Sequence, residues 1–351
     1  MKYKRIVIKV GTKVITDEKS LLCKKAMSRI VEQIVQLKKQ GVEVVLVSSG
    51  AMGAGRPLVK FSKKPKRILE RQMLASVGQT RLINAYDQLF SKHDYLCAQV
   101  LATKEDFRDR KHYLNMQNCM EGLLDDQIIP IVNENDVISV DELMFTDNDE
   151  LAGLLASQLD ADALLLLTSV DGLTQGDEVV ETVDFKKDNV CPYIKPTKSS
   201  FGRGGMITKC KIAERMSQVG IHTHIINGEK PNIVLDVLQN KNVGTTFLIQ
   251  KKISGVKKWI AHSEGREKGK VFIDDKAVEI LTATNTAASL LPVGITKVSG
   301  EFEKDDIIKI KNQKGKSVGL GVVQYGSKKA EELIGKKGEK PLVHYDYLFM
   351  F

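Results

Sequence analysis

The sequence predicts an α/β protein: a three-layer α/β/α sandwich with a mainly parallel central sheet, followed by a small β-barrel-like domain. Apolar runs of strand length alternate with helical patterns over about the first 250 residues, which is typical of parallel β-α-β units. The run 163–167 is continuously apolar, as expected for a central strand covered on both faces. After Trp259, short β-rich segments follow one another without long helices, which indicates a second domain.

The chain length of 351 residues favours two domains, at roughly 150 residues each. We place the first domain at residues 1–255, a linker at 256–267 and the second domain at 268–351. The net charge of +9 comes from scattered basic residues, which indicates a lysine-rich surface rather than a nucleic-acid site. Five cysteines without a C-x-x-C pair disfavour a disulfide framework or structural zinc and indicate a reducing, cytoplasmic location. No apolar run reaches ~18 residues, so no membrane span is expected.

Strands of the central sheet are predicted where β-branched and aliphatic residues cluster, at 5–9, 42–47, 95–101, 128–132, 163–167 and 221–226. Helices are predicted from apolar residues at helical spacing, at 23–39, 72–90, 109–124 and from Asn148 or Asp149 onward. The weakly patterned segment 177–205 is interpreted as a long loop or small hairpin. In the second domain we predict strands at 271–273, 295–298, 307–310 and 318–325 and helices at 277–281 and 328–334.

A polar stretch from Asn133 to Asp149 contains nine acids and amides among seventeen residues. It begins at the end of a predicted strand and ends where a helix begins, which is where open α/β sheets bind their ligands. Asn148 or Asp149 could cap that helix, but capping explains only one polar residue. We therefore expect a binding site here.

Three glycine-rich turns occur at 9–12, 48–51 and 202–206. Glycine lets backbone amides approach an anion closely, so amides at Gly11 and Gly50 are candidate anion ligands. Lys9 lies beside the first turn and Lys209 follows the third. Together these features indicate a polyanionic ligand.

Other common ligand and catalytic motifs are missing from the sequence. The frame Gly50 to Gly55 continues as Arg56-Pro57 instead of Lys and Ser or Thr, which excludes a P-loop. There is no G-x-G-x-x-G after the first strand, no H-E-x-x-H and no nucleophile elbow. Phosphoryl transfer fits best, because it requires positioning and charge neutralisation more than covalent help.

Ordered motifs over almost the whole chain carry a family resemblance: residues 8–12, 47–51, 77–79, 106–107, 109–110, 113–115, 133–136, 147–149, 166–173, 204–206, 208–209, 289–295 and 298–302. Together they resemble the amino acid kinase family with a C-terminal PUA domain, in the branch that phosphorylates L-glutamate. The resemblance implies ATP-dependent phosphorylation of the γ-carboxylate of L-glutamate to L-glutamyl 5-phosphate, the first step of proline biosynthesis. It also implies that Mg²⁺ bridges the phosphates of ATP, with no protein metal ligand assigned. Proline is expected as feedback inhibitor, and the protein is expected to form a homo-dimer or homo-tetramer.

The resemblance also assigns site residues. Lys9, Asp149 and Lys209 are expected to be catalytic, with the acid holding both lysines. The expected substrate residues are Ser49, Gly50, Asp136 and Asn148. The expected nucleotide residues are Lys9, Gly11, Thr168, Ser169, Arg203, Gly204, Gly205, Met206, Ile207, Thr208 and Lys209. No general base is needed, because a γ-carboxylate is ionised at neutral pH.

The chain departs from the family at two nucleotide-site segments. Arg203 stands where the family usually has Thr, and Leu173 is followed by Thr-Gln-Gly-Asp instead of the usual Tyr-Thr and Asp-Pro. Other substrates of the family (aspartate, N-acetylglutamate, carbamate or a nucleoside monophosphate) remain alternatives. So does an RNA-binding protein with a kinase scaffold. From residue 260 onward the sequence has 15 basic and 13 acidic residues, and this small net charge disfavours RNA binding by the PUA domain.

Overall fold

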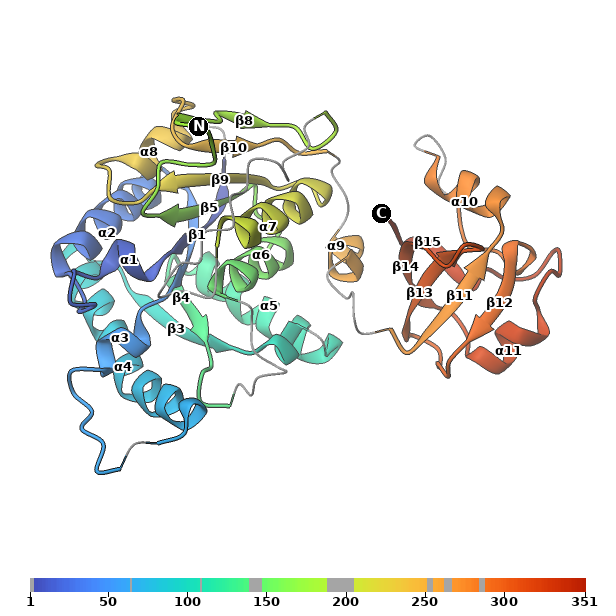
Figure 1. Ribbon diagram of the computed structural model, residues 1–351, viewed down its shortest axis with the longest axis horizontal. Coiled ribbons are helices and arrows are strands. Elements are labelled where there is room, and N and C mark those ends of the chain that lie inside the picture. The colour runs from blue at the N-terminus through green and yellow to red at the C-terminus, as the bar shows by residue number, and fades with distance from the viewer. Residues whose placement is uncertain are drawn as a thin grey trace. The chain divides into compact units, whose positions relative to one another are not determined.

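The computed structural model describes residues 3–63, 65–107, 109–138, 147–187, 205–250, 255–261, 267–283 and 288–351. The chain divides into two compact units, Met1–Lys252 and Ile253–Phe351 (Figure 1). Each unit has its own sheet and its own hydrophobic core. None of the helices in these described ranges is long and apolar enough to cross a membrane.

The first unit contains an eight-stranded sheet in the order β3-β4-β2-β1-β5-β9-β10-β8. Its strands are β1 (Arg5–Val10), β2 (Glu43–Ser48), β3 (Cys97–Ala102), β4 (Ile129–Glu134), β5 (Ala163–Thr168), β8 (Thr182–Val183), β9 (His222–Asn227) and β10 (Thr245–Phe247). The pairs from β3 to β9 are parallel, and β10 runs antiparallel to β9. The carboxyl ends of six strands therefore meet at one edge of the sheet.

Helices cover both faces of this sheet. They are α1 (Thr12–Ile15), α2 (Lys24–Lys39), α3 (Ala51–Gly55), α4 (Arg67–Phe90), α5 (Arg110–Asp125), α6 (Asn148–Gln158), α7 (Met206–Gln218) and α8 (Ile233–Leu238), with short 3₁₀ turns η1 (Ser91–His93) and η2 (Lys104–Phe107). Alternate residues of β1 show why two layers are needed: Ile6 and Ile8 join the core under α2, α4 and α8, and Val7 is equally buried on the opposite face. Figure 1 shows α2 and α8 on one side of the sheet and α5, α6 and α7 on the other. This confirms the predicted three-layer sandwich.

All six predicted strands are observed, and each continues one or two residues beyond its predicted end. Helix α4 begins at Arg67 rather than at residue 72. The prediction missed this start because no capping side chain marks it in the sequence. Helix α8 and strand β10 were not predicted. The segment predicted as a long loop or small hairpin is described at residues 177–187 and 205. Its strand β7 (Glu178–Val179) pairs with β6 (Thr174–Gln175), which precedes the segment, and its strand β8 joins the edge of the large sheet.

The second unit contains a five-stranded sheet in the order β12-β11-β13-β14-β15. Its elements are α9 (Gly255–Ala261), β11 (Gly269–Ile273), α10 (Asp275–Thr282), η4 (Pro292–Gly294), β12 (Ile295–Ser299), β13 (Ile307–Asn312), β14 (Ser317–Val323), α11 (Ser327–Glu332) and β15 (Val343–Met350). All neighbouring strands are antiparallel except β11 and β13. Strand β15 was not predicted, and α9 begins one residue before the range predicted as linker and otherwise lies within it.

Candidate active site

Two lysines meet one aspartate at the carboxyl edge of the large sheet. Nζ of Lys9, in β1, lies 2.6 Å from Oδ1 of Asp149, and Nζ of Lys209, in α7, lies 2.7 Å from Oδ2. Asp149 is fully buried, and Lys9 and Lys209 are only 6% and 7% exposed. Each ammonium therefore occupies one oxygen of the same carboxylate.

The electrostatics of this cluster favour a bound anion. Burial by itself would raise the pKa of Asp149, but the attraction of Lys9 and Lys209 outweighs it and lowers the pKa to about 2. The three side chains thus carry two positive charges and one negative charge in a buried position. A phosphate or carboxylate entering this site would meet the two ammonium groups at low effective dielectric.

The start of helix α6 presents two of the predicted residues to the site. Asp147 caps the helix, since its Oδ1 accepts hydrogen bonds from the amides of Asp149 at 2.8 Å and Glu150 at 3.2 Å. The cap is therefore Asp147, rather than Asn148 or Asp149 as considered from the sequence, which leaves both of those side chains for the site. Burial, and then the charge of Asp149, raises the pKa of Asp147 to about 6.

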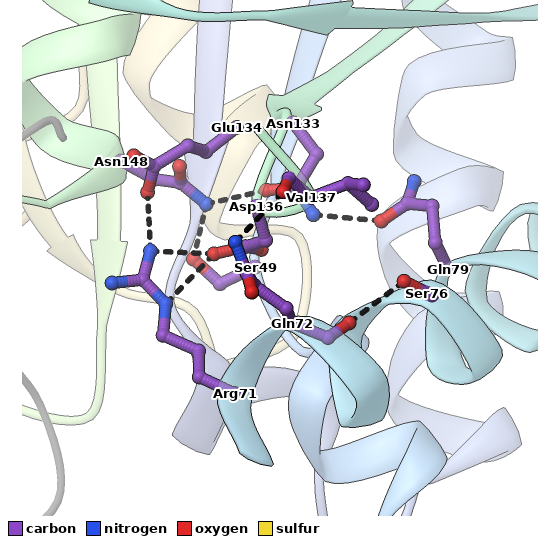
Figure 2. A network of polar contacts seen from close by, with 10 residues as sticks. All are labelled: Ser49, Arg71, Gln72, Ser76, Gln79, Asn133, Glu134, Asp136, Val137 and Asn148. Carbon is purple, nitrogen blue, oxygen red and sulfur yellow. Dashed lines mark hydrogen bonds and ion pairs between the residues drawn. The ribbon is translucent and has the colours of Figure 1, made fainter. Parts of the chain in front are cut away.

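A chain of amide hydrogen bonds begins at Asn148, the neighbour of Asp149 in the sequence (Figure 2). Nδ2 of Asn148 donates to Oγ of Ser49 and to Oδ1 of Asn133, both at 2.9 Å. Nδ2 of Asn133 donates in turn to Oε1 of Gln79 at 2.8 Å. The chain joins the ends of β2 and β4 to helices α4 and α6.

The fourth predicted substrate residue, Asp136, is bound by an arginine of α4. Nε of Arg71 lies 2.9 Å from Oδ1 of Asp136, and Nη2 also contacts Oε2 of Glu134 at 3.0 Å. The neighbouring Gln72 donates through Nε2 to the carbonyl oxygen of Val137 at 2.8 Å. Helix α4 therefore holds the turn after β4 at several points, as Figure 2 shows.

The two predicted anion-binding glycines have different structural roles. The amide of Gly11 donates to the carbonyl oxygen of Leu167 at 3.1 Å. The contact of this amide with an anion stays a prediction. A Cβ at this position would lie 3.2 Å from the carbonyl oxygen of Leu167, which is a tight contact. Gly50 has a φ of +107°, a conformation that favours glycine, and it precedes α3.

The predicted nucleotide residues lie at the ends of β5 and at the start of α7. Thr168 ends β5 and Ser169 follows it, while Gly205 precedes α7 and 206–209 form its first turn. Arg203 and Gly204 lie outside the described residues. Near the ends of β5 and β9 there is a cavity of about 230 Å³, lined in part by Asp171, Asn227, Lys230 and Gly244.

Five residues of this site were not among the predicted site residues: Arg71, Gln79, Asn133, Glu134 and Asp147. Signals existed for four of them, because Asn133, Glu134 and Asp147 belong to the polar stretch and Gln79 belongs to the 77–79 motif. Arg71 had no signal, since the predicted helix began one residue later. The predicted substrate residues divide into two groups: Ser49 and Asn148 are hydrogen bonded to each other, whereas Asp136 is bound by Arg71.

Comparisons with known proteins agree with this architecture. Residues 4–227 match the Amino acid kinase family and residues 269–345 match the PUA domain. The chain is 49% identical to a protein of Chlorobaculum tepidum named glutamate 5-kinase, covering 99% of this chain and 98% of the relative. It is 48% identical to a protein of the same name from Bacteroides thetaiotaomicron, covering 99% of each.

A solved structure shares the fold of the first unit. Carbamate kinase from Giardia lamblia bound to AMP-PNP superposes with a TM-score of 0.51 at 20% identity, covering 70% of this chain and 99% of that protein. At this identity the likeness concerns the fold alone. The family match and the two relatives of nearly equal length establish that the chain belongs to the amino acid kinase family and carries a C-terminal PUA domain.

Proposed function

We propose that the chain is a glutamate 5-kinase, which transfers the γ-phosphoryl group of ATP to the γ-carboxylate of L-glutamate. The products are L-glutamyl 5-phosphate and ADP, and the reaction is the first step of proline biosynthesis. The observation that carries this proposal is the pairing of Lys9 and Lys209 with Asp149. The names of the two relatives support the choice of glutamate over the other acceptors of the family.

The chemistry needs charge neutralisation. An oxygen of the γ-carboxylate forms a bond to the γ-phosphorus while the bond between that phosphorus and the β,γ-bridging oxygen breaks, and ADP leaves with the electron pair. Both reactants are anions, so their repulsion contributes to the barrier. The ammonium groups of Lys9 and Lys209 would offset the repulsion most strongly where charge accumulates on the transferred phosphoryl. Asp149 would keep the two amines in place.

The substrate residues would bind the ends of glutamate that do not react. The carboxylate of Asp136 can pair with the ammonium group of the amino acid, with Arg71 holding the carboxylate in position. Ser49 and Asn148 are hydrogen bonded to each other where β2 ends and α6 begins, and would bind a carboxylate oxygen and the ammonium group of the amino acid. Gly50 would let the backbone approach the substrate closely.

The nucleotide would extend from the lysines toward Thr168, Ser169 and the start of α7. The cavity at Asp171 and Lys230 is consistent with a nucleotide at that end of the sheet. We keep Arg203 and Gly204 as proposed phosphate neighbours on the strength of the sequence alone. Met206, Ile207 and Thr208, with Gly205, supply the first turn of α7, whose N-terminus favours phosphate.

Magnesium fits this site as a companion of ATP rather than as a resident ion. Within the described ranges no group of three or more His, Cys, Asp or Glu is arranged to hold a metal. Oδ2 of Asp147 is buried, and among the described residues it has no hydrogen-bond partner. Since Mg²⁺ is usually held by one or two carboxylates together with phosphates, Asp147 is the side chain that would hold it. When bound, the ion neutralises phosphate charge.

Four further proposals concern assembly, regulation, RNA binding and location. A homo-dimer or homo-tetramer is consistent with the exposed apolar side chains of Leu101 on the edge strand β3 and of Met73 and Val77 on α4. Proline, as a chemical relative of glutamate, would inhibit by overlapping the substrate pocket, and RNA binding by the PUA domain stays disfavoured by charge. A cytoplasmic location fits the use of ATP and the four free cysteines of the described residues.

Hydroxylamine trapping tests the proposed function directly, because acyl phosphates react with hydroxylamine to give hydroxamates. The protein is incubated with ATP, Mg²⁺ and glutamate, aspartate or N-acetylglutamate, and ADP release is followed with carbamate and nucleoside monophosphates. Hydroxamate from glutamate, with no comparable product from the other acceptors, would support the proposal. Preference for another acceptor would contradict it.

A further inference from the structure

We infer that Gln79 is a positioning residue that sets the direction of the hydrogen bonds running through Asn133 and Asn148 to Ser49. This inference rests on the proposed function and deepens it, because it concerns how the same pocket recognises the ammonium group of its substrate. Gln79 belongs to the 77–79 motif, to which the proposed chemistry assigns no task. It lies on α4, and its carbonyl oxygen is the last acceptor of the chain.

The direction of each bond follows from the one before it. Because Oε1 of Gln79 accepts from Nδ2 of Asn133, the amide of Asn133 turns its Oδ1 toward Asn148. Nδ2 of Asn148 donates to that oxygen and to Oγ of Ser49. Both N–H bonds of Asn148 are then used, so this amide can bind a ligand only through its carbonyl oxygen.

The opposite direction would give a pocket of opposite polarity. If Gln79 donated instead, Asn133 would donate to Oδ1 of Asn148. Ser49 could then form a hydrogen bond with Asn148 only by donating its own O–H to that oxygen. Asn148 would then offer N–H donors to a ligand. With Gln79 as acceptor, the O–H of Ser49 remains free to donate to a carboxylate oxygen of the ligand. The carbonyl oxygen of Asn148 remains free to accept from an ammonium group. This direction places the ammonium group at Asn148 and the carboxylate at Ser49, whereas the opposite direction would exchange them.

The two ends of the chain are held by the closest helix contact in this region. An added Cβ at Gly78 would lie 1.7 Å from the carbonyl oxygen of Ala51, and one at Gly55 would lie 2.0 Å from the carbonyl oxygen of Leu74. Helix α4, which carries Gln79, therefore packs directly against α3, which follows Ser49 and Gly50. A polar chain with both ends fixed can keep one direction without help from the ligand.

The test compares glutamate with glutarate, which has both carboxylates but no ammonium group. We measure kcat/KM for each with wild type, Gln79→Met and Gln79→Glu. Methionine cannot accept from Asn133 as an amide does, so the Asn133 and Asn148 amides can turn, and the preference for glutamate should fall by about tenfold. The ionised carboxylate introduced by Gln79→Glu can only accept hydrogen bonds, so this variant should keep the preference for glutamate within about threefold of wild type. Gln88→Met, at an exposed position of the same helix, is the matched control.

The ratio separates positioning from a merely structural role, because loss of folded protein lowers both activities equally. An unchanged ratio in Gln79→Met, or an equal loss of ratio in Gln79→Glu, would overturn the inference. Calorimetric binding of glutamate and glutarate without ATP repeats the comparison independently of phosphoryl transfer. If wild type binds glutamate but forms no hydroxamate, the proposed function fails and the binding ratios still decide the role of Gln79. If wild type binds no glutamate, both fail.

Discussion

Nζ of Lys209 lies 2.7 Å from Oδ2 of Asp149, a carboxylate with no exposed surface that lies 60 positions earlier in the chain. Lys9 occupies the other oxygen of the same carboxylate. A buried ion cluster gains little stability, because removing charges from water costs about as much as their attraction returns. A buried pair of ammonium groups is therefore better explained by the anions it would bind than by the stability of the fold.

Replacing Lys209 by alanine should lower kcat by roughly 10²- to 10³-fold, the effect typical of losing one donor to a developing charge. The KM for glutamate should change much less, because the lysine acts mainly on the phosphoryl group in flight. Lys211→Ala, at an exposed position of α7, is the matched control and should keep near-normal kcat. Steady-state kinetics with both substrates check this, and an unchanged kcat in Lys209→Ala would refute the assignment.

Replacing Asp149 by asparagine should lower the free energy of unfolding by roughly 3 kcal/mol at neutral pH, because two buried ammonium groups lose their counter-charge. The pKa of Asp149 is about 2 in the folded protein, below its ordinary value. Its stabilising contribution is therefore present above about pH 4 and is lost as pH falls toward 2.

Urea unfolding at several pH values measures this effect. The difference between wild type and Asp149→Asn should shrink as pH falls from 4 toward 2, and a difference independent of pH would contradict the electrostatic explanation. Asp126→Asn, at an exposed position, should stay within about 0.5 kcal/mol of wild type.

The carboxylate of Asp147 should make kcat/KM for ATP fall on the acid side of about pH 6, which gives the pH profile an acid limb. Burial, followed by the charge of Asp149, raises the pKa of Asp147 to about 6, so the group loses its negative charge as pH falls through 6. If it helps to hold Mg²⁺ with ATP, kcat/KM for ATP should fall below that pH. Asp147→Asn can keep the helix cap through its oxygen, yet it should lack this limb. A limb that persists unchanged in the variant would exclude Asp147 as its source.

Gly78 should tolerate no side chain, because its Cβ would lie 1.7 Å from the carbonyl oxygen of Ala51. Gly78→Ala must separate α3 from α4, and we expect the free energy of unfolding to fall by about 3 kcal/mol. Gly122→Ala is the matched control: in α5 an added Cβ meets nothing within 4 Å, so the helix should gain up to about 1 kcal/mol. Denaturant unfolding of both variants checks the sign, and equal effects would contradict the close packing.

The sequence predicted elements well where local patterns decide them. The apolar runs of β1, β2 and β5 and the helical spacing in α2 and α5 agree with the structure to within a few residues. Prediction of elements from the sequence was poorer where tertiary contacts decide whether an element forms or where it begins. The short strand β10 exists because it pairs with β9, and the start of α4 has no local cap. Nothing in their own residues indicated either feature.

The sequence by itself determined the order of the main strands and helices along the chain and marked Lys9, Asp149 and Lys209 as charged residues at the ends of those elements. Only the tertiary structure decided that Arg71 binds Asp136, that Asp147 caps α6, and that Gln79 ends the amide chain. The physical reason is that hydrophobic period and turn chemistry act over a few residues. The partner of a polar side chain depends instead on which distant segments packing brings within about 3 Å of it.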